Sequence, residues 1–358
     1  MALNPMANDR FRTTHDEGKM QPQIQIPQVS GTTSHWRRNL RSSFQHYTFV
    51  DYATQGYLAL VGLIVVCLHD DAVPLWPLLL VAHAVGIGLV HTLIQSHAAH
   101  PNNRVFDFLR HFYPVLLYTG LYRETAELNH MLIAGFLDPF FIRLEARVFG
   151  LQPSLSFMDQ LPYLVVSEPL YAAYFSYYLM VAGVGLALFY RNREQFFHYL
   201  SVISFLFYVC YLIYIFLPVV GPPIFFQEIT DYRLPAEVQP AVSPTFPAAI
   251  QVGLFYQIMA WIYHTFEAPG ASFPSSHIAV AIGTVYFSFR YLRSIRWLHL
   301  AAVILLCLGT IYCRYHYVVD VLAGGATAAV LIPIGNRLYF KFRKAVEPER
   351  SLNQSIPS

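Results

Sequence analysis

Long apolar stretches separated by short polar turns make up most of this chain. A helix needs roughly 20 mostly apolar residues to cross the hydrocarbon core of a bilayer. The pattern therefore predicts an all-α protein, a multi-pass transmembrane helical bundle. Seven stretches meet the criterion, at residues 51–69, 73–93, 162–190, 196–218, 276–289, 297–313 and 317–340.

Basic residues flank these stretches on alternate sides. Because lysine and arginine are enriched in cytoplasmic loops, they predict that both termini and two of the turns are cytoplasmic. The residues concerned are Arg37, Arg38, Arg41, Arg191, Arg193, Arg290, Arg293, Arg296, Lys341, Arg343 and Lys344.

Two cytoplasmic termini require an even number of crossings, so an eighth is expected. The best candidate is residues 112–136, whose charged residues must face the bundle interior or an interface. Residues 137–149 are then expected to form an amphipathic helix on the outer surface. Its charged side chains are expected to face water, and they are Arg143, Glu145 and Arg147.

The same pattern divides the chain into four parts. Residues 1–46 are polar and are expected to be a disordered cytoplasmic tail. Residues 47–160 hold the N-terminal spans and the amphipathic helix, residues 161–340 form the membrane core, and residues 341–358 form a second cytoplasmic tail.

Composition supports a lipid environment and excludes some partners. The chain is 55% hydrophobic and only 12% charged, whereas soluble domains usually carry about 25% charged residues. A net charge of +2 is too small to suggest a nucleic-acid partner. The four cysteines show no CxxC spacing, so a zinc site is not expected.

The segment GASFPSSH, residues 270–277, carries the first candidate chemistry. Ser275 and Ser276 stand where a helix begins, and serine is a favoured N-cap. A helix N-terminus has unpaired N–H groups and a partial positive charge, which bind phosphate well. We therefore expect both serines to contact a phosphate and His277 to lie beside it.

The second segment, YCRYHYVVD, covers residues 312–320. His316 and Asp320 are four residues apart and share a helix face, so the carboxylate can orient the imidazole. Arg314 has a planar guanidinium suited to a bidentate phosphate contact.

Topology brings the two segments to the same, non-cytoplasmic face, because one span leaves that face and the next returns to it. The residue types then predict phosphoryl transfer. Neutral His316 attacks phosphorus and forms a phosphohistidine, oriented by Asp320, and His277 acts as general acid. No metal or other cofactor is required.

Some of these residues also fit other roles. A single histidine inside a membrane is often only hydrogen-bonded, and His316 with Asp320 would need further ligands to hold a metal. Asp320 alone could couple protons in a transporter. Glu168 is interpreted as structural. Four tyrosines are interpreted as an interface belt or packing face, with substrate contact as the lesser reading, and they are Tyr171, Tyr174, Tyr177 and Tyr178.

These motifs resemble those of the type 2 phosphatidic-acid phosphatase superfamily. Pro274-Ser275-Ser276-His277 is similar to its PSGH motif, and His316 and Asp320 match the end of SRxxxxxHxxxD. The resemblance implies a six-helix core, here preceded by extra N-terminal spans. It also implies that His316 is the nucleophile, Asp320 its orienting partner and His277 the acid.

Two departures refine the resemblance. The family's KxxxxxxRP motif is missing from the sequence, and Thr310 stands where its usual arginine would be. The patterns GxxFPSxH, from Gly270, and YxxxHYxxD, from Tyr312, resemble the branch that contains the fungal inositol phosphorylceramide synthases.

This branch implies a lipid phosphotransferase that transfers a phospho-headgroup, with inositol phosphate as one candidate. The alternative is a phosphatase that hydrolyses phosphatidic acid or a polyprenyl (pyro)phosphate. The expected partners are the bilayer and a phospholipid or lipid phosphate substrate. The expected location is a bacterial cytoplasmic membrane with the site on the periplasmic face, or the lumenal face in a eukaryote.

Overall fold

The computed structural model describes residues 44–228 and 245–353, with side chains at residues 44–226 and 245–343. Thirteen helices and no β-strand occur in these ranges, which confirms the all-α prediction. Most of the predicted N-terminal tail lies outside the described residues. The helices are α2 (Phe49–Leu68), α3 (Trp76–Ala99), α4 (Arg104–Leu128), α5 (Asp138–Phe149), α6 (Pro153–Gln160), α7 (Leu164–Arg191), α8 (Arg193–Phe216), α9 (Pro222–Glu228), α10 (Ala248–Gln251), α11 (Leu254–Phe266), α12 (Ser276–Tyr291), α13 (Arg296–Tyr312) and α14 (Val318–Asn353).

Each of the seven predicted stretches corresponds to one helix, namely α2, α3, α7, α8, α12, α13 and α14. Among the described residues, five helices are long and apolar enough to cross a membrane: α2, α3, α7, α8 and the Val318–Arg343 part of α14. Helices α12 and α13 are shorter, with 16 and 17 residues. The chain therefore has the character of an integral membrane protein.

Helix α4 occupies much of the region expected to hold the eighth crossing. It has 25 residues, but it begins at Arg104 and ends at Leu128 rather than spanning residues 112–136. Glu124 faces the bundle, where a carboxylate oxygen lies 3.5 Å from Nδ1 of His83 on α3. Whether α4 crosses the bilayer stays a prediction.

Helix α5 forms where the amphipathic helix was predicted, but one of the three charged side chains expected to face water, that of Glu145, is buried. Arg143 and Arg147 are exposed, as expected. Glu145 is only 1% exposed, so the prediction that it faces water is wrong. It is buried because its carboxylate accepts hydrogen bonds from the backbone N–H of Val319, at 3.0 Å, and from the side chain of Gln152.

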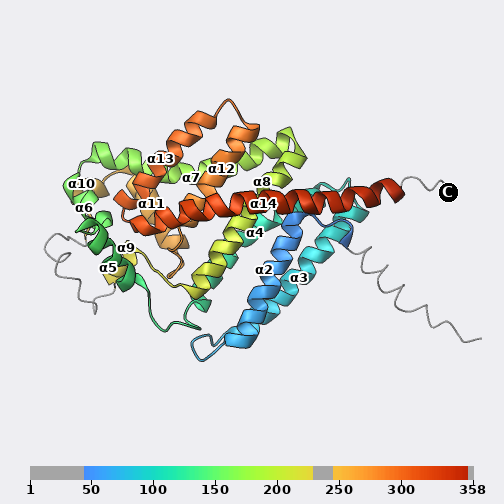
Figure 1. Cartoon of the computed structure of the whole chain (residues 1–358), viewed down its shortest axis with the longest axis horizontal. Helices are drawn as coiled ribbons and strands as arrows, with labels where there is room; N and C mark the ends of the chain where they lie inside the picture. The colour runs from blue at the N-terminus through green and yellow to red at the C-terminus, as the bar shows by residue number, and fades with distance from the viewer. Residues whose placement is uncertain (1–43, 229–244, 354–358) are drawn as a thin grey trace, which may run out of the picture. The chain divides into compact units, whose positions relative to one another are not determined.

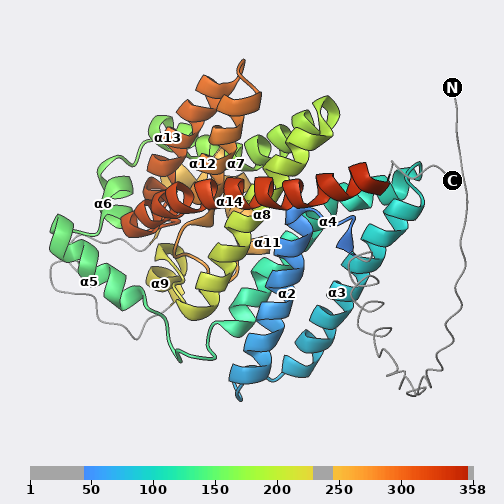
Figure 2. The ribbon, with the colours of Figure 1, turned by 45° about the vertical axis from the view of Figure 1, so that its right-hand side comes forward.

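Helix α12 lies at the centre of the core. It packs against α7, α8, α13 and α14, while α2 and α4 pack against α8. Figures 1 and 2 show α12 and α13 side by side, with α14 running past them and α2 and α3 adjacent to each other. Two segments distant in sequence, the start of α12 and the end of α13, are thereby brought together.

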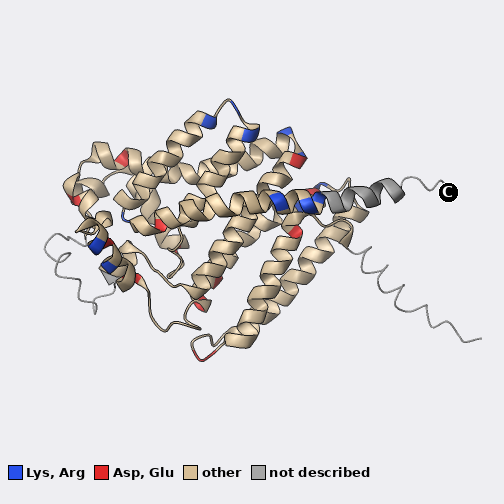
Figure 3. Cartoon of the chain, in the orientation of Figure 1, with Lys and Arg blue, Asp and Glu red and all other residues tan. Residues whose placement is uncertain are grey.

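The far end of α12 lies among the basic turns. Arg191, after α7, donates to the backbone oxygen of Tyr291 at the end of α12, at 3.4 Å. Arg343 of α14 forms an ion pair with Glu194 at the start of α8. Figure 3 shows basic residues at the α12–α13 turn and along the second half of α14. The basic turns therefore share one end of the bundle, about 20 Å along α12 from His277.

Helix α14 approaches the start of α12 closely at Gly324. A Cβ atom on Gly324 would lie 2.5 Å from the backbone oxygen of Ser275 and 3.1 Å from Cβ of Ile278. Contacts this short with backbone do not occur without a shift, so only glycine allows the observed packing. The adjacent Gly325 is different, because its Cβ would meet only Cδ1 of Ile282, at 4.0 Å.

Candidate active site

A third segment joins the two predicted by the sequence. Val219, in the loop after α8, forms an isolated parallel bridge with Ala271. The N–H of Val219 donates to the oxygen of Gly270, at 3.2 Å, and the N–H of Ser272 donates to the oxygen of Val219, at 2.9 Å. This bridge holds the loop before α12 in place and directs Ser272 toward the end of α13.

His316, Asp320 and Ser272 form one hydrogen-bonded group. Nδ1 of His316 lies 3.3 Å from Oδ2 of Asp320 and 3.0 Å from Oγ of Ser272. The Ser272 hydroxyl donates to the same Oδ2, at 2.8 Å. With the proton on Nδ1, the imidazole is oriented by both partners and Nε2 carries the free lone pair.

The other ring nitrogen of His316 faces Ser275. Oγ of Ser275 lies 3.1 Å from Nε2, so the hydroxyl can donate to the lone pair of that nitrogen. Ser275 is also the N-cap of α12, where its oxygen accepts from the N–H of Ile278 at 3.4 Å. Burial lowers the pKa of His316 to about 3, which keeps the imidazole neutral, as a nucleophile must be.

His277 and Ser276 lie beside this group. The ring centroids of His277 and His316 are 5.9 Å apart. The N–H of Ser276 donates to the hydroxyl oxygen of Tyr214, at 3.1 Å, and that hydroxyl donates to the oxygen of Pro274, at 2.9 Å. One of the helix amides predicted to bind phosphate therefore already has a partner.

Arg314 is held away from solvent by other partners. Its guanidinium donates to Oδ1 of Asp159, on α6, at 2.6 Å, and stacks over the ring of Phe246, at 5.4 Å. The residue has a φ of 64° and is 1% exposed. The predicted phosphate contact stays a prediction, because a phosphate would compete with Asp159 for this cation.

A cavity of about 710 Å³ opens beside His277 between α4, α7, α8, α11 and α12. Half of the described residues that line it are aromatic, and none of these described residues is a lysine or an arginine. Three of the tyrosines singled out from the sequence line it: Tyr174, Tyr177 and Tyr178. The rings of Tyr174 and Tyr177 lie 5.3 and 4.9 Å from that of His277, so the face interpreted as packing also borders the site.

Comparison with known families agrees with this geometry. The sequence profile of the PAP2 superfamily matches residues 140–334, which is more than half of the chain. The chain belongs to the PAP2 superfamily. No curated protein and no solved structure matches it.

The region that matches the PAP2 superfamily includes most of α5, which carries two carboxylates toward the site. Asp138 is fully buried and accepts from the N–H groups of Val220 and Gly221 and from the hydroxyl of Tyr317, each at 2.9 Å. Glu145 accepts from the N–H of Val319. Helix α5 therefore holds the start of α14 and the bridged loop at once.

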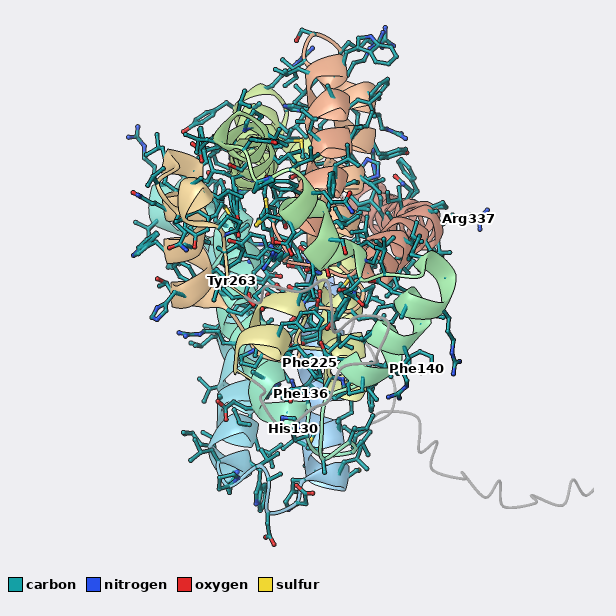
Figure 4. The ribbon with its side chains drawn as sticks, turned by 90° about the vertical axis from the view of Figure 1, so that its left-hand side faces the viewer. His130, Phe136, Phe140, Phe225, Tyr263 and Arg337 are labelled. Atoms are coloured by element: carbon teal, nitrogen blue, oxygen red, sulfur yellow. The ribbon has the colours of Figure 1, made fainter. Side chains whose placement is uncertain are left out.

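An apolar cluster supports these contacts. It joins α5, the loop after α8, α9 and the residue next to His316, through Phe141, Ile142, Val219, Val220, Phe225 and Tyr317. Figure 4 views this side of the protein and labels Phe225 on α9, Phe140 on α5 and Phe136, which precedes α5. Burial raises the pKa of Asp138 to about 6 and that of Glu145 to about 7, against the opposing effect of their hydrogen bonds.

Sequence reasoning missed Ser272, Asp138 and Glu145 as site residues. Ser272 carried a weak signal, since it lies five residues before His277 in the same loop. Asp138 and Glu145 carried no sequence signal, because each accepts hydrogen bonds from residues far along the chain.

We expect Asp138→Asn to lower kcat about ten-fold with little change in KM. The amide turns a donor toward Val220, Gly221 or Tyr317, so at least one hydrogen bond is lost and His316 shifts. Steady-state kinetics on a PAP2-type lipid substrate measure this effect. Tyr317→Phe, which removes a single donor, should show a smaller decrease. An unchanged kcat in Asp138→Asn would contradict a positioning role.

Proposed function

We propose that this protein is a membrane phosphotransferase that acts on lipid phosphodiesters through a phosphohistidine at His316. The observation that supports it is the arrangement around that imidazole. Its Nδ1 is fixed by Asp320 and Ser272, and its Nε2 faces the start of α12 beside His277. Membership of the PAP2 superfamily supports the broader class, a phosphatase or phosphotransferase with lipid-related substrates.

The reaction takes two steps in this proposal. First, Nε2 of His316 bonds to phosphorus as the bond from phosphorus to the departing alcohol breaks, and protonated His277 gives its proton to that oxygen. Second, neutral His277 takes the proton of an incoming alcohol, whose oxygen bonds to phosphorus as the P–N bond to His316 breaks. The serine hydroxyls and the positive end of the α12 helix dipole stabilise the equatorial oxygens.

The charge around the site favours a diester over a monoester. A phosphate monoester carries about −1.5 to −2 charge at neutral pH, whereas a diester carries a single negative charge. No lysine or arginine occurs among the lining residues in the described ranges, and Arg314 is paired with Asp159. A substrate with less charge to neutralise fits these surroundings better. The sequence resemblance suggests inositol phosphate as one headgroup that could be transferred.

The basic turns support an orientation for the protein in the membrane. They share the end of the bundle remote from His277, so a cytoplasmic position for them places the site at the opposite, outer face. For a bacterial protein this is the periplasmic face of the cytoplasmic membrane, with both termini inside.

A transfer assay tests the proposal. Purified protein in sealed vesicles is supplied either with phosphatidic acid or with phosphatidylinositol and a lipid alcohol, in the leaflet on the site's side. We expect a new phospholipid in the second case and little inorganic phosphate in the first. Phosphate release from phosphatidic acid or a polyprenyl phosphate, with no new phospholipid, would contradict transfer and support hydrolysis.

A further inference from the structure

Of the described residues that line the cavity beside His277, Glu267 is the only one with a carboxylate. It is the C-cap residue of α11, and α11 packs against α7. No sequence motif includes it, and the proposed reaction does not use it. It lines the same cavity as His277 and Ser276, so a substrate in this cavity can contact both the Glu267 carboxyl group and the start of α12.

The Glu267 carboxylate has little to neutralise it. Among the described residues, its hydrogen-bond partner is the hydroxyl of Tyr122, which lies 3.4 Å from Oε1. The surroundings of this carboxylate are apolar, and burial raises the pKa of Glu267 to about 8. An unpaired carboxylate in apolar surroundings is unfavourable, and a bound cation removes that cost.

The rings at this end of the cavity are of the kind that binds a cation. Tyr122 contacts Glu267, and Tyr174, Tyr177 and Tyr178 surround His277. Tyrosine faces attract ammonium groups, and several such faces together recognise choline-like ligands. A carboxylate and several tyrosine faces thus provide two complementary contacts for one ammonium group.

A polyol headgroup fits this surface less well. It needs several hydrogen-bond partners, and apart from the tyrosine hydroxyls the described lining residues offer five polar side chains, those of Thr119, Trp261, Glu267, Ser276 and His277, among largely apolar and aromatic walls. Some of the tyrosine hydroxyls are already engaged. That of Tyr118 lies 2.6 Å from Oγ of Ser204, and that of Tyr199 donates to the oxygen of Val181, at 2.9 Å.

We propose that the cavity end formed by Glu267 and these tyrosines binds an ammonium group attached to the transferred phosphate. The substrate class is then a zwitterionic phospholipid with an aminoalcohol headgroup. This inference rests on the proposed function and narrows it, since it favours an aminoalcohol over inositol.

The test compares phosphatidylethanolamine, phosphatidylglycerol and phosphatidylinositol as donors to a lipid alcohol. For the unmodified protein, we expect kcat/KM for phosphatidylethanolamine to exceed the other two by about ten-fold or more, the effect of one charge-assisted contact. In Glu267→Gln this preference should fall to near unity. Glu127→Gln, which changes an exposed carboxylate on α4, should keep it.

The adduct on His316 separates the two proposals. Mass spectrometry of rapidly quenched protein should find an aminoethyl-phosphoryl group on this residue. A preference for phosphatidylinositol, or a Glu267→Gln variant that slows all three donors equally, would overturn the ammonium site and leave the phosphohistidine intact. No adduct with any donor would overturn the proposed function itself.

Discussion

Replacing His316 with alanine is expected to abolish turnover of lipid substrates, with a decrease in kcat of about 10⁴-fold or more. The reason is that, in the part of the chain that the structure describes, His316 is the histidine of the site whose Nδ1 is held by a buried carboxylate, which leaves the lone pair of Nε2 for the proposed attack on phosphorus. The covalent adduct should disappear with the activity. Both effects are measured on protein purified in detergent, by product formation and by mass spectrometry of the quenched enzyme.

The control for this experiment is His264→Ala, which removes an exposed histidine on α11 that does not line the cavity. It should retain activity and the adduct. A function that survives His316→Ala would contradict the enzymatic proposal. It would favour the alternative in which Asp320 couples protons to transport.

The second large effect is expected from Gly324→Ala. A Cβ atom 2.5 Å from the backbone oxygen of Ser275 must push α14 away from the start of α12. That contact is where the N–H of Ser275 donates to the oxygen of Asp320, at 3.1 Å, so the shift separates the two halves of the site. Because a misplacement of about 1 Å can cost 10²-fold in rate, we expect kcat/KM to fall by about that factor.

Gly325→Ala is the matched control, since it adds the same methyl group one residue further along α14. Its Cβ makes only ordinary contact, at 4.0 Å from Ile282. Activity and thermal unfolding of both variants are measured side by side. If the two variants lose activity equally, helix packing in general is responsible rather than the approach at Gly324.

The helices were accessible to sequence reasoning because lipid imposes a strict length and polarity on them. Seven apolar stretches predicted seven helices, including the short α12 and α13, whose apolar runs end at basic turns. Helix α4 was harder to delimit because charged residues interrupt its apolar pattern. Its observed start follows Asn103, whose side chain accepts from the backbone N–H groups of Val105 and Phe106.

Within the site, local spacing carried most of the information. His316 and Asp320 are four residues apart, and their contact follows from that spacing. Ser275 capping α12 also follows from local chemistry. The Ser272 contact depends on a loop bridged to Val219, and a bridge between residues 52 positions apart leaves no local pattern.

Glu145 was predicted to be exposed but is buried. An acidic residue in an amphipathic helix is normally solvated, and by that rule it should face water. Its carboxylate instead accepts from the backbone N–H of Val319, 174 residues later. A buried partner that is a backbone amide cannot be recognised from residue types, because every residue other than proline carries one.

The contacts of α5 determine which fragment of this protein can retain the geometry of the site. A fragment that begins with the apolar run at residue 162 would contain both histidines and every transmembrane helix that bears them. It would nevertheless leave the Tyr317 hydroxyl and the Val219–Gly221 loop without the Asp138 acceptor, and the start of α14 without Glu145. A fragment that keeps the site intact therefore starts before α5. A chimera joined after this helix would contain both histidines but would lack the hydrogen bonds to Asp138 and Glu145 that position the segments around them.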